Sequence, residues 1–139
     1  MKTAFVDSSV LFTAVNSPTG GSAKLFTLKN IKLITTRFVF TEVERNVRSK
    51  LQTYHLDRFF MLVEQLTTLD QAPRYTLTRR AKNVIVEKDA VILAESKQSK
   101  AHFLLTLDHK HFFTLSARNF VKPQRIVTPK MLIELLEKR

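Results

Sequence analysis

The feature that most constrains this chain is a short apolar run near its start that ends on an acid. Residues 2–9 read KTAFVDSS, so Asp7 directly follows Ala4, Phe5 and Val6. A short apolar run of this kind is typical of a strand buried in a parallel sheet. Ligands bind at the carboxyl ends of such strands, because the loops there open onto a crevice. Asp7 is therefore predicted to face a binding site.

Three other acids occur in comparable settings. Glu42 lies on a predicted helix just after a second apolar run, Asp89 opens another helix, and Asp108 directly follows a third apolar run. Right-handed crossovers bring all the strand ends to the same edge of a parallel sheet. Carboxylates gathered there repel one another, and a divalent cation removes the conflict. Because oxygen ligands favour hard ions, the sequence predicts a Mg²⁺ or Mn²⁺ site.

Apolar periodicity predicts that strands and helices alternate along the chain. After the first strand, further strands are expected at residues 31–35, 102–106 and 125–127. Helices are expected at residues 38–51, 56–69, 90–98 and 130–138. Residues 71–77, which contain a proline, are expected to be irregular or a poor edge strand. This alternation predicts an α/β fold with three layers, α/β/α, around a central parallel sheet of four or five strands. Residues 1–139 are expected to form one domain.

The charge of the chain predicts a polyanionic partner. It carries 23 Lys and Arg against 12 Asp and Glu, a formal net charge of +11. A packed domain with this excess attracts nucleic acid. Arg45, Arg79, Arg80 and Lys82 are candidates for RNA contact, with a solvated basic face as the alternative. The absence of cysteine excludes disulfides and thiol chemistry. Without a run of about 20 apolar residues, a cytoplasmic protein without a membrane span is expected.

Several of these residues have a second interpretation. Glu42 could instead be a first-turn acid that complements the helix dipole. Asp89 could instead cap the helix that follows it. His109 and His111 are spaced i, i+2 on a short predicted helix, which rarely turns two imidazoles toward one ion, so surface or packing roles are expected for both. A phosphotransfer receiver domain is disfavoured, because its paired acids and strand-end lysine have no counterpart here.

The four acids stand in motifs that resemble those of the PIN-domain ribonucleases, which include VapC-type toxins. The resemblance is carried by residues 5–11 (FVDSSVL), 40–43 (FTEV), 89–94 (DAVILA), 105–112 (LTLDHKHF) and 126–129 (IVTP). It covers essentially the whole chain.

The resemblance implies a Mg²⁺- or Mn²⁺-dependent endoribonuclease in which Asp7, Glu42, Asp89 and Asp108 are the catalytic and metal-binding residues. It places Ser9 and Thr106 as polar neighbours of the metal. It also implies a homodimer and, in toxin form, a small antitoxin partner. Two alternatives stay open: an RNA-processing PIN nuclease that is not a toxin, and a catalytically inert PIN-like module that only binds RNA.

Overall fold

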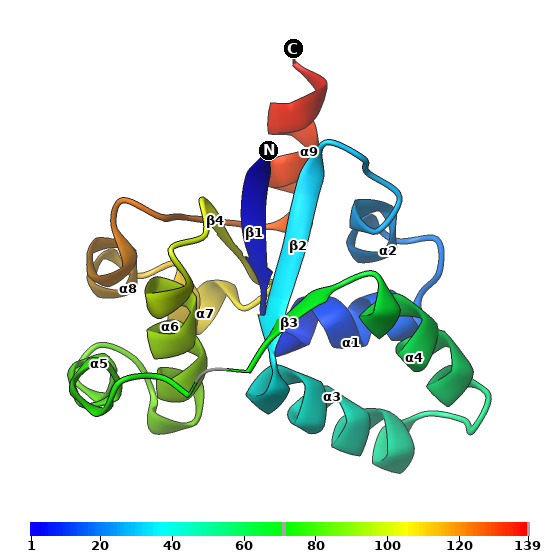
Figure 1. The fold of residues 1–139 in the computed structure, drawn as a ribbon, viewed down its shortest axis with the longest axis horizontal. Helices are drawn as coiled ribbons and strands as arrows, with labels where there is room; N and C mark the ends of the chain where they lie inside the picture. Colours follow the sequence, from blue (N-terminus) through cyan, green and yellow to red (C-terminus); the bar gives the residue numbers. More distant parts are fainter. Residues whose placement is uncertain (71, 139) are drawn as a thin grey trace.

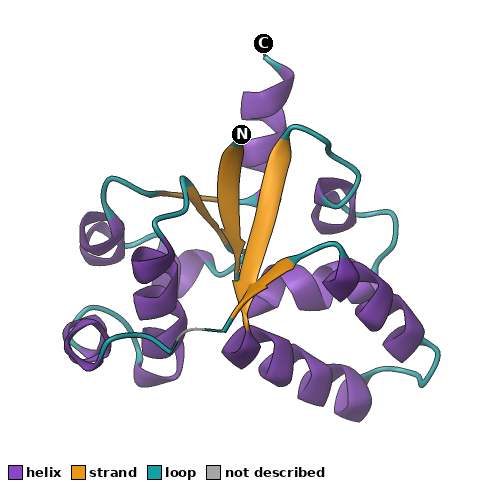
Figure 2. Ribbon diagram, in the orientation of Figure 1, coloured by secondary structure: helices purple, strands orange, loops and turns teal. Residues whose placement is uncertain are grey.

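The computed structural model describes residues 1–70 and 72–138. Within them, five parallel strands form one sheet in the order β3-β2-β1-β4-β5, with helices around it (Figures 1 and 2). The strands are β1 (Lys2–Val6), β2 (Ile31–Thr36), β3 (Thr67–Leu69), β4 (Phe103–Leu105) and β5 (Arg125–Val127). The helices are α1 (Ser8–Asn16), α2 (Gly21–Leu25), α3 (Arg37–Lys50), α4 (His55–Glu64), α5 (Tyr75–Lys82), α6 (Glu87–Ser99), α7 (His109–Phe112), α8 (Leu115–Val121) and α9 (Pro129–Glu137).

The centre of the sheet is apolar on both faces, as the first apolar run predicts. Phe5 of β1 pairs with Leu104 of β4, Val6 pairs with Leu105, and all four side chains are fully buried. Helices α1, α3 and α4 lie to one side of the sheet, and α5, α6 and α8 lie to the other (Figure 1). The predicted three-layer α/β/α architecture is confirmed. Among the described residues, no helix combines the length and the apolarity needed to cross a bilayer.

Two of the predicted elements differ from the structure. The helix expected at residues 56–69 ends at Glu64, and its last three residues form the edge strand β3. Leu66 continues the apolar spacing of α4 and is buried, but the β-branched Thr67 and Thr68 that follow favour an extended chain. The apolar spacing therefore predicts a longer helix than the one that forms.

Helix α5 is the second difference, because it begins inside the stretch expected to be irregular. Leu77 and Ala81, four residues apart, are its buried side chains, and it packs against α6. With so few apolar residues its periodicity is weak, and packing on α6 supplies the stabilisation that the sequence pattern lacks. Gln71, the first residue of that stretch, lies outside the described residues.

Thr128 is the N-cap of the last helix, α9. Its side chain accepts a hydrogen bond from the backbone N–H of Met131 at 3.1 Å, and Pro129 is the first helical residue. The cap satisfies a donor that has no partner within the helix.

We expect Thr128→Ala to lower the free energy of unfolding by about 1 kcal/mol, because the capping oxygen is lost. Urea denaturation followed by circular dichroism measures this difference. Thr128→Ser keeps the hydroxyl and is the matched control, with stability close to that of the native protein. Equal stability of the alanine variant and the native chain would contradict a stabilising role for the cap.

Candidate metal centre

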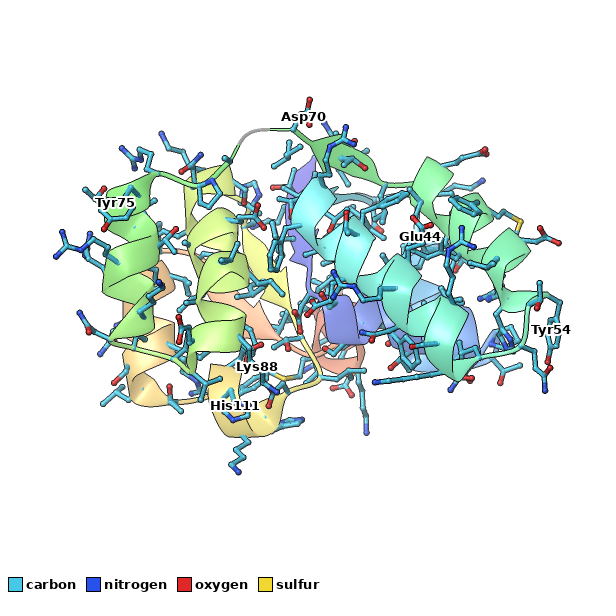
Figure 3. The ribbon with its side chains drawn as sticks, turned by 90° about the horizontal axis from the view of Figure 1, so that it is seen from below. Glu44, Tyr54, Asp70, Tyr75, Lys88 and His111 are labelled. Carbon is cyan, nitrogen blue, oxygen red and sulfur yellow. The ribbon has the colours of Figure 1, made fainter. Side chains whose placement is uncertain are left out.

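The four predicted acids surround one pocket at the carboxyl edge of the sheet. The pocket has a volume of about 230 Å³, and Asp7, Glu42, Asp89 and Asp108 all line it. It lies beyond the end of β1. The strand order reverses there, because β2 and β3 lie on one side of β1 and β4 and β5 lie on the other. Open parallel sheets bind ligands at such a point. Figure 3 views the molecule from this edge.

Asp7 is the most deeply placed of the four acids. It follows β1 directly and is only 4% exposed. Its Oδ2 accepts hydrogen bonds from the hydroxyls of Ser9 and Thr106, each at 2.8 Å. Burial raises the pKa of the Asp7 carboxyl, and these two hydrogen bonds act against that rise. Ser9 and Thr106, expected near the metal, thus contact its most buried candidate ligand.

The two hydroxyls are themselves held by the loop after β4. The backbone N–H of Leu107 donates to Ser9 Oγ at 3.0 Å, and that of Asp108 donates to Thr106 Oγ1 at 3.1 Å. This loop therefore orients Asp7 as well as carrying Asp108.

Glu42 lies in the second turn of α3, because the helix begins at Arg37. The alternative interpretation of Glu42 as a first-turn acid is therefore wrong. Its Oε1 accepts a hydrogen bond from the hydroxyl of Ser8, the first residue of α1. Asn46 and Lys50 follow Glu42 at intervals of four residues and line the same pocket. One face of α3 therefore supplies an acid, an amide and a cation.

Asp89 is in the first turn of α6 but does not cap it. The N-cap residue is Val86, without a side-chain cap, so the capping interpretation is wrong. Asp89 Oδ2 is buried and has no hydrogen-bond partner among the described residues. Glu95, further along α6, is also buried, but its Oε1 accepts a hydrogen bond from Thr36 at 2.7 Å. Asp89 Oδ2 is thus a buried polar atom that the protein leaves unsatisfied.

Asp108 and His111 form a close pair beside Asp89. Asp108 caps α7 by accepting from the backbone N–H of His111 at 3.1 Å, and His111 Nδ1 lies 2.8 Å from Asp108 Oδ2. The same Nδ1 lies 3.8 Å from Asp89 Oδ2. His109 is exposed and stacks on Phe113, in agreement with the expected surface or packing role. The ring of His111 instead lies close to the carboxylates of Asp89 and Asp108.

The electrostatics of the cluster suit a bound cation. Burial, followed by the charges of Asp7 and Asp108, raises the pKa of Asp89 to about 6. Burial also acts to raise the pKa of Asp108, but hydrogen bonds from His111 outweigh it and hold that pKa below its ordinary value. An unsatisfied buried oxygen among other carboxylates fits a divalent ion bound by oxygen ligands. The residues present therefore suit a Mg²⁺ or Mn²⁺ ion.

The predicted RNA-binding residues are not among those that line this pocket. Arg79 lies over the ring of Tyr75, Arg80 lies over Phe120, and Lys82 forms an exposed ion pair with Glu87. Arg45 is exposed on α3.

Two lysines line the pocket instead and were not predicted. Lys50 is the last residue of α3, and Lys88 is the residue before Asp89. The charge of Lys88 acts to lower the pKa of both Asp89 and Asp108. Figure 3 shows Lys88 and His111 near each other, with Tyr75 of α5 well away from them.

A larger hollow, of about 690 Å³, lies at the amino end of β5. Arg118, Lys122 and Arg125 line it together with apolar side chains such as Ile126 and Met131. It contains no carboxylate and is not a candidate metal site.

Comparison with known proteins identifies the fold. No protein-family model and no curated protein sequence matches the chain. Among solved structures, PAE2754 from Pyrobaculum aerophilum superimposes with a TM-score of 0.66 at 15% identity, over 99% of this chain and 91% of that one. The fold is that of a PIN domain.

Two further solved structures share the fold. VapC20 of Mycobacterium tuberculosis, a toxin that cleaves the sarcin-ricin loop, has a TM-score of 0.58 at 14% identity, over 77% of this chain and 91% of its own. A chain of FitAB, in the structure of that complex bound to an IR36 DNA fragment, has a TM-score of 0.55 at 16% identity, over 91% of this chain and 94% of its own. At these identities the comparison establishes the PIN fold.

We expect Asp89→Asn to stabilise the metal-free protein at neutral pH. The raised pKa means that folding disfavours the ionised carboxyl, so the native chain loses stability as pH rises from about 4 through about 6. At pH 7 in EDTA, the variant should exceed the native protein by about 1–3 kcal/mol, and near pH 4 the two should be similar. Urea denaturation at each pH measures the difference.

Asp57→Asn, on the exposed surface of α4, is the control for replacing an aspartate elsewhere. A difference between Asp89→Asn and the native chain that does not change with pH would contradict a strained carboxylate at this position.

Proposed function

We propose that this PIN-fold chain is a metal-dependent endoribonuclease that hydrolyses phosphodiester bonds in RNA. The observation that carries the proposal is the convergence of Asp7, Glu42, Asp89 and Asp108 on one pocket, with a buried oxygen of Asp89 left unpaired. A fold alone does not specify an activity, so the proposal depends on these side chains.

The protein orients three of the four acids with its own hydrogen bonds. Ser9 and Thr106 hold Asp7, Ser8 holds Glu42, and the backbone N–H of His111 holds Asp108. Each carboxylate is therefore fixed before any ligand arrives, which lowers the entropic cost of assembling a site. Asp89 is oriented by its place in the first turn of α6 and offers its free oxygen to the pocket.

A divalent ion in this pocket would lower the pKa of a bound water and neutralise charge that develops on the phosphodiester. The residues that would hold it are Asp7, Asp89 and Asp108, with Glu42 as a ligand directly or through a water. Asn46, Lys50 and Lys88 line the same pocket and would offer an amide and two positive charges to a phosphate. By the family resemblance, the products carry 5′-phosphate and 3′-hydroxyl ends.

The biological setting that we propose is a toxin–antitoxin pair. Two of the PIN-fold neighbours, VapC20 and FitAB, come from structures of a toxin and of a complex bound to DNA. We infer by analogy that this chain forms a homodimer and is held inactive by a small antitoxin protein.

Asp7→Asn and Asp108→Asn should each abolish EDTA-sensitive cleavage of RNA while leaving the fold intact. Asparagine preserves the size of the side chain, and at position 108 it can still cap α7, but it removes the negative charge. Cleavage of single-stranded RNA with Mn²⁺ or Mg²⁺ measures the loss, and far-UV circular dichroism checks the fold.

The matched control is Asp57→Asn, for which activity should be unchanged. Undiminished cleavage by both site variants would remove these residues from the mechanism. If the native chain binds RNA but cleaves none with either metal, the inert RNA-binding alternative is correct.

The pocket lysines generate a separate prediction about RNA affinity. Lys50→Ala and Lys88→Ala should each weaken binding of single-stranded RNA and reduce the slope of log K against log salt by up to about 0.7, because one phosphate contact is lost. Fluorescence anisotropy in EDTA at several salt concentrations measures both quantities.

Lys32→Ala controls for the loss of a positive charge, because Lys32 is exposed near the amino end of β2, away from the pocket. Arg79→Ala tests the basic face of α5 by the same measurement. A larger effect of Arg79→Ala than of either pocket lysine would favour α5 as the path of the RNA.

A further inference from the structure

His111 is built into the acid cluster more firmly than a surface residue would be. It is the third residue of α7, and both its backbone N–H and its ring contact the Asp108 carboxylate, at 3.1 and 2.8 Å. The ring contact holds Nδ1 against the Asp108 carboxylate. The side chain is only 24% exposed.

The ligand atoms of His111, Asp89 and Asp108 have spacings that suit one metal ion. All three lie within 4.8 Å of one another, with Nδ1 at 2.8 Å from Asp108 Oδ2 and 3.8 Å from Asp89 Oδ2. Ligand atoms about 2.1 Å from an octahedral ion lie about 3 Å apart when adjacent and about 4.2 Å apart when opposite. The observed spacings fall close to this range, and Asp89 Oδ2 has no other partner.

We propose that His111 Nδ1 is a direct ligand of the divalent ion and that it makes the site select Mn²⁺ over Mg²⁺. This inference rests on the proposed function, which places a divalent ion between Asp89 and Asp108. Mg²⁺ prefers oxygen ligands and gives up its waters reluctantly, whereas Mn²⁺, a transition-metal ion, accepts an imidazole nitrogen more readily than Mg²⁺ does. Replacing one oxygen ligand by Nδ1 therefore shifts the preference toward Mn²⁺.

The competing role for His111 is that of a hydrogen-bond donor that only orients Asp108. Nδ1 cannot both donate a proton to Asp108 and bind a metal, so the two roles are chemically exclusive. His111→Asn separates them, because the asparagine amide can still donate to Asp108 but supplies no imidazole nitrogen. His109→Asn, two residues away on the same helix, is the matched control, because His109 is exposed and stacks on Phe113.

The test is direct measurement of metal binding, without RNA or turnover. Electron paramagnetic resonance follows the titration of Mn²⁺, and competition gives the affinity for Mg²⁺. We expect the ratio of Mn²⁺ to Mg²⁺ affinity to fall about tenfold or more in His111→Asn and to stay unchanged in His109→Asn. Electron spin echo spectroscopy of the native Mn²⁺ complex should show coupling to an imidazole nitrogen that is lost in His111→Asn.

The outcomes separate this inference from the proposed function. One outcome is that the native chain binds Mn²⁺, that Asp89→Asn abolishes this binding, and that the bound ion shows no nitrogen coupling. This outcome would overturn the histidine ligand but would not contradict the metal-dependent nuclease. Failure of the native chain to bind either ion would overturn both. The nitrogen measurement uses the native protein, so it stays decisive even if His111→Asn folds poorly.

Discussion

The structure of the site depends on the cost of burying the Asp7 carboxylate at the end of β1. A carboxylate removed from water is unfavourable unless hydrogen bonds or a cation compensate it. Ser9 and Thr106 supply two such hydrogen bonds, but burial still raises the pKa of Asp7. Because β1 lies at the centre of the sheet, every other acid of the cluster must be placed relative to this one residue.

The loop after β4 links this requirement to the rest of the pocket. Its backbone N–H groups hold the two hydroxyls that hold Asp7, and the same loop carries Asp108 and begins α7. A shift of β4 relative to β1 would therefore disturb two carboxylates and His111 together. The apolar pairing of Phe5 with Leu104 and of Val6 with Leu105 resists such a shift. The packing of the core therefore also fixes the geometry of the site.

Features that depend on residues close together in the sequence could be predicted, and features that depend on distant residues could not. Asp7 and Asp108 were predictable because each follows an apolar run of the sequence, and the PIN fold was predictable from the order of such motifs. Asp89 and Glu42 also line the pocket, but their surroundings depend on where each helix begins, which periodicity defines only within a few residues. Strand β3 and helix α5 were missed because neither has a strong apolar pattern of its own.

His111 shows most clearly what spacing alone leaves out. His109 and His111 form an i, i+2 pair, and this spacing does not indicate a shared ligand. Compared with Asp108, His111 lies three residues on, a separation that places two side chains on the same face of a helical turn. The second comparison was available in the sequence. What the sequence could not supply was the distance between His111 and Asp89, which comes from a different helix and has its Oδ2 3.8 Å from the imidazole Nδ1.

The acidic pocket and the net positive charge of the chain have opposite effects on a polyanion. A polyanion is drawn to the net charge of +11 from a distance, but bare carboxylates at the pocket would repel its phosphates at close range. Lys50 and Lys88 reduce this repulsion at the pocket itself, and a divalent ion would reverse it. On the proposed function, RNA should therefore bind weakly at the pocket of the metal-free chain and more tightly once the carboxylates are neutralised, which couples RNA binding to metal binding.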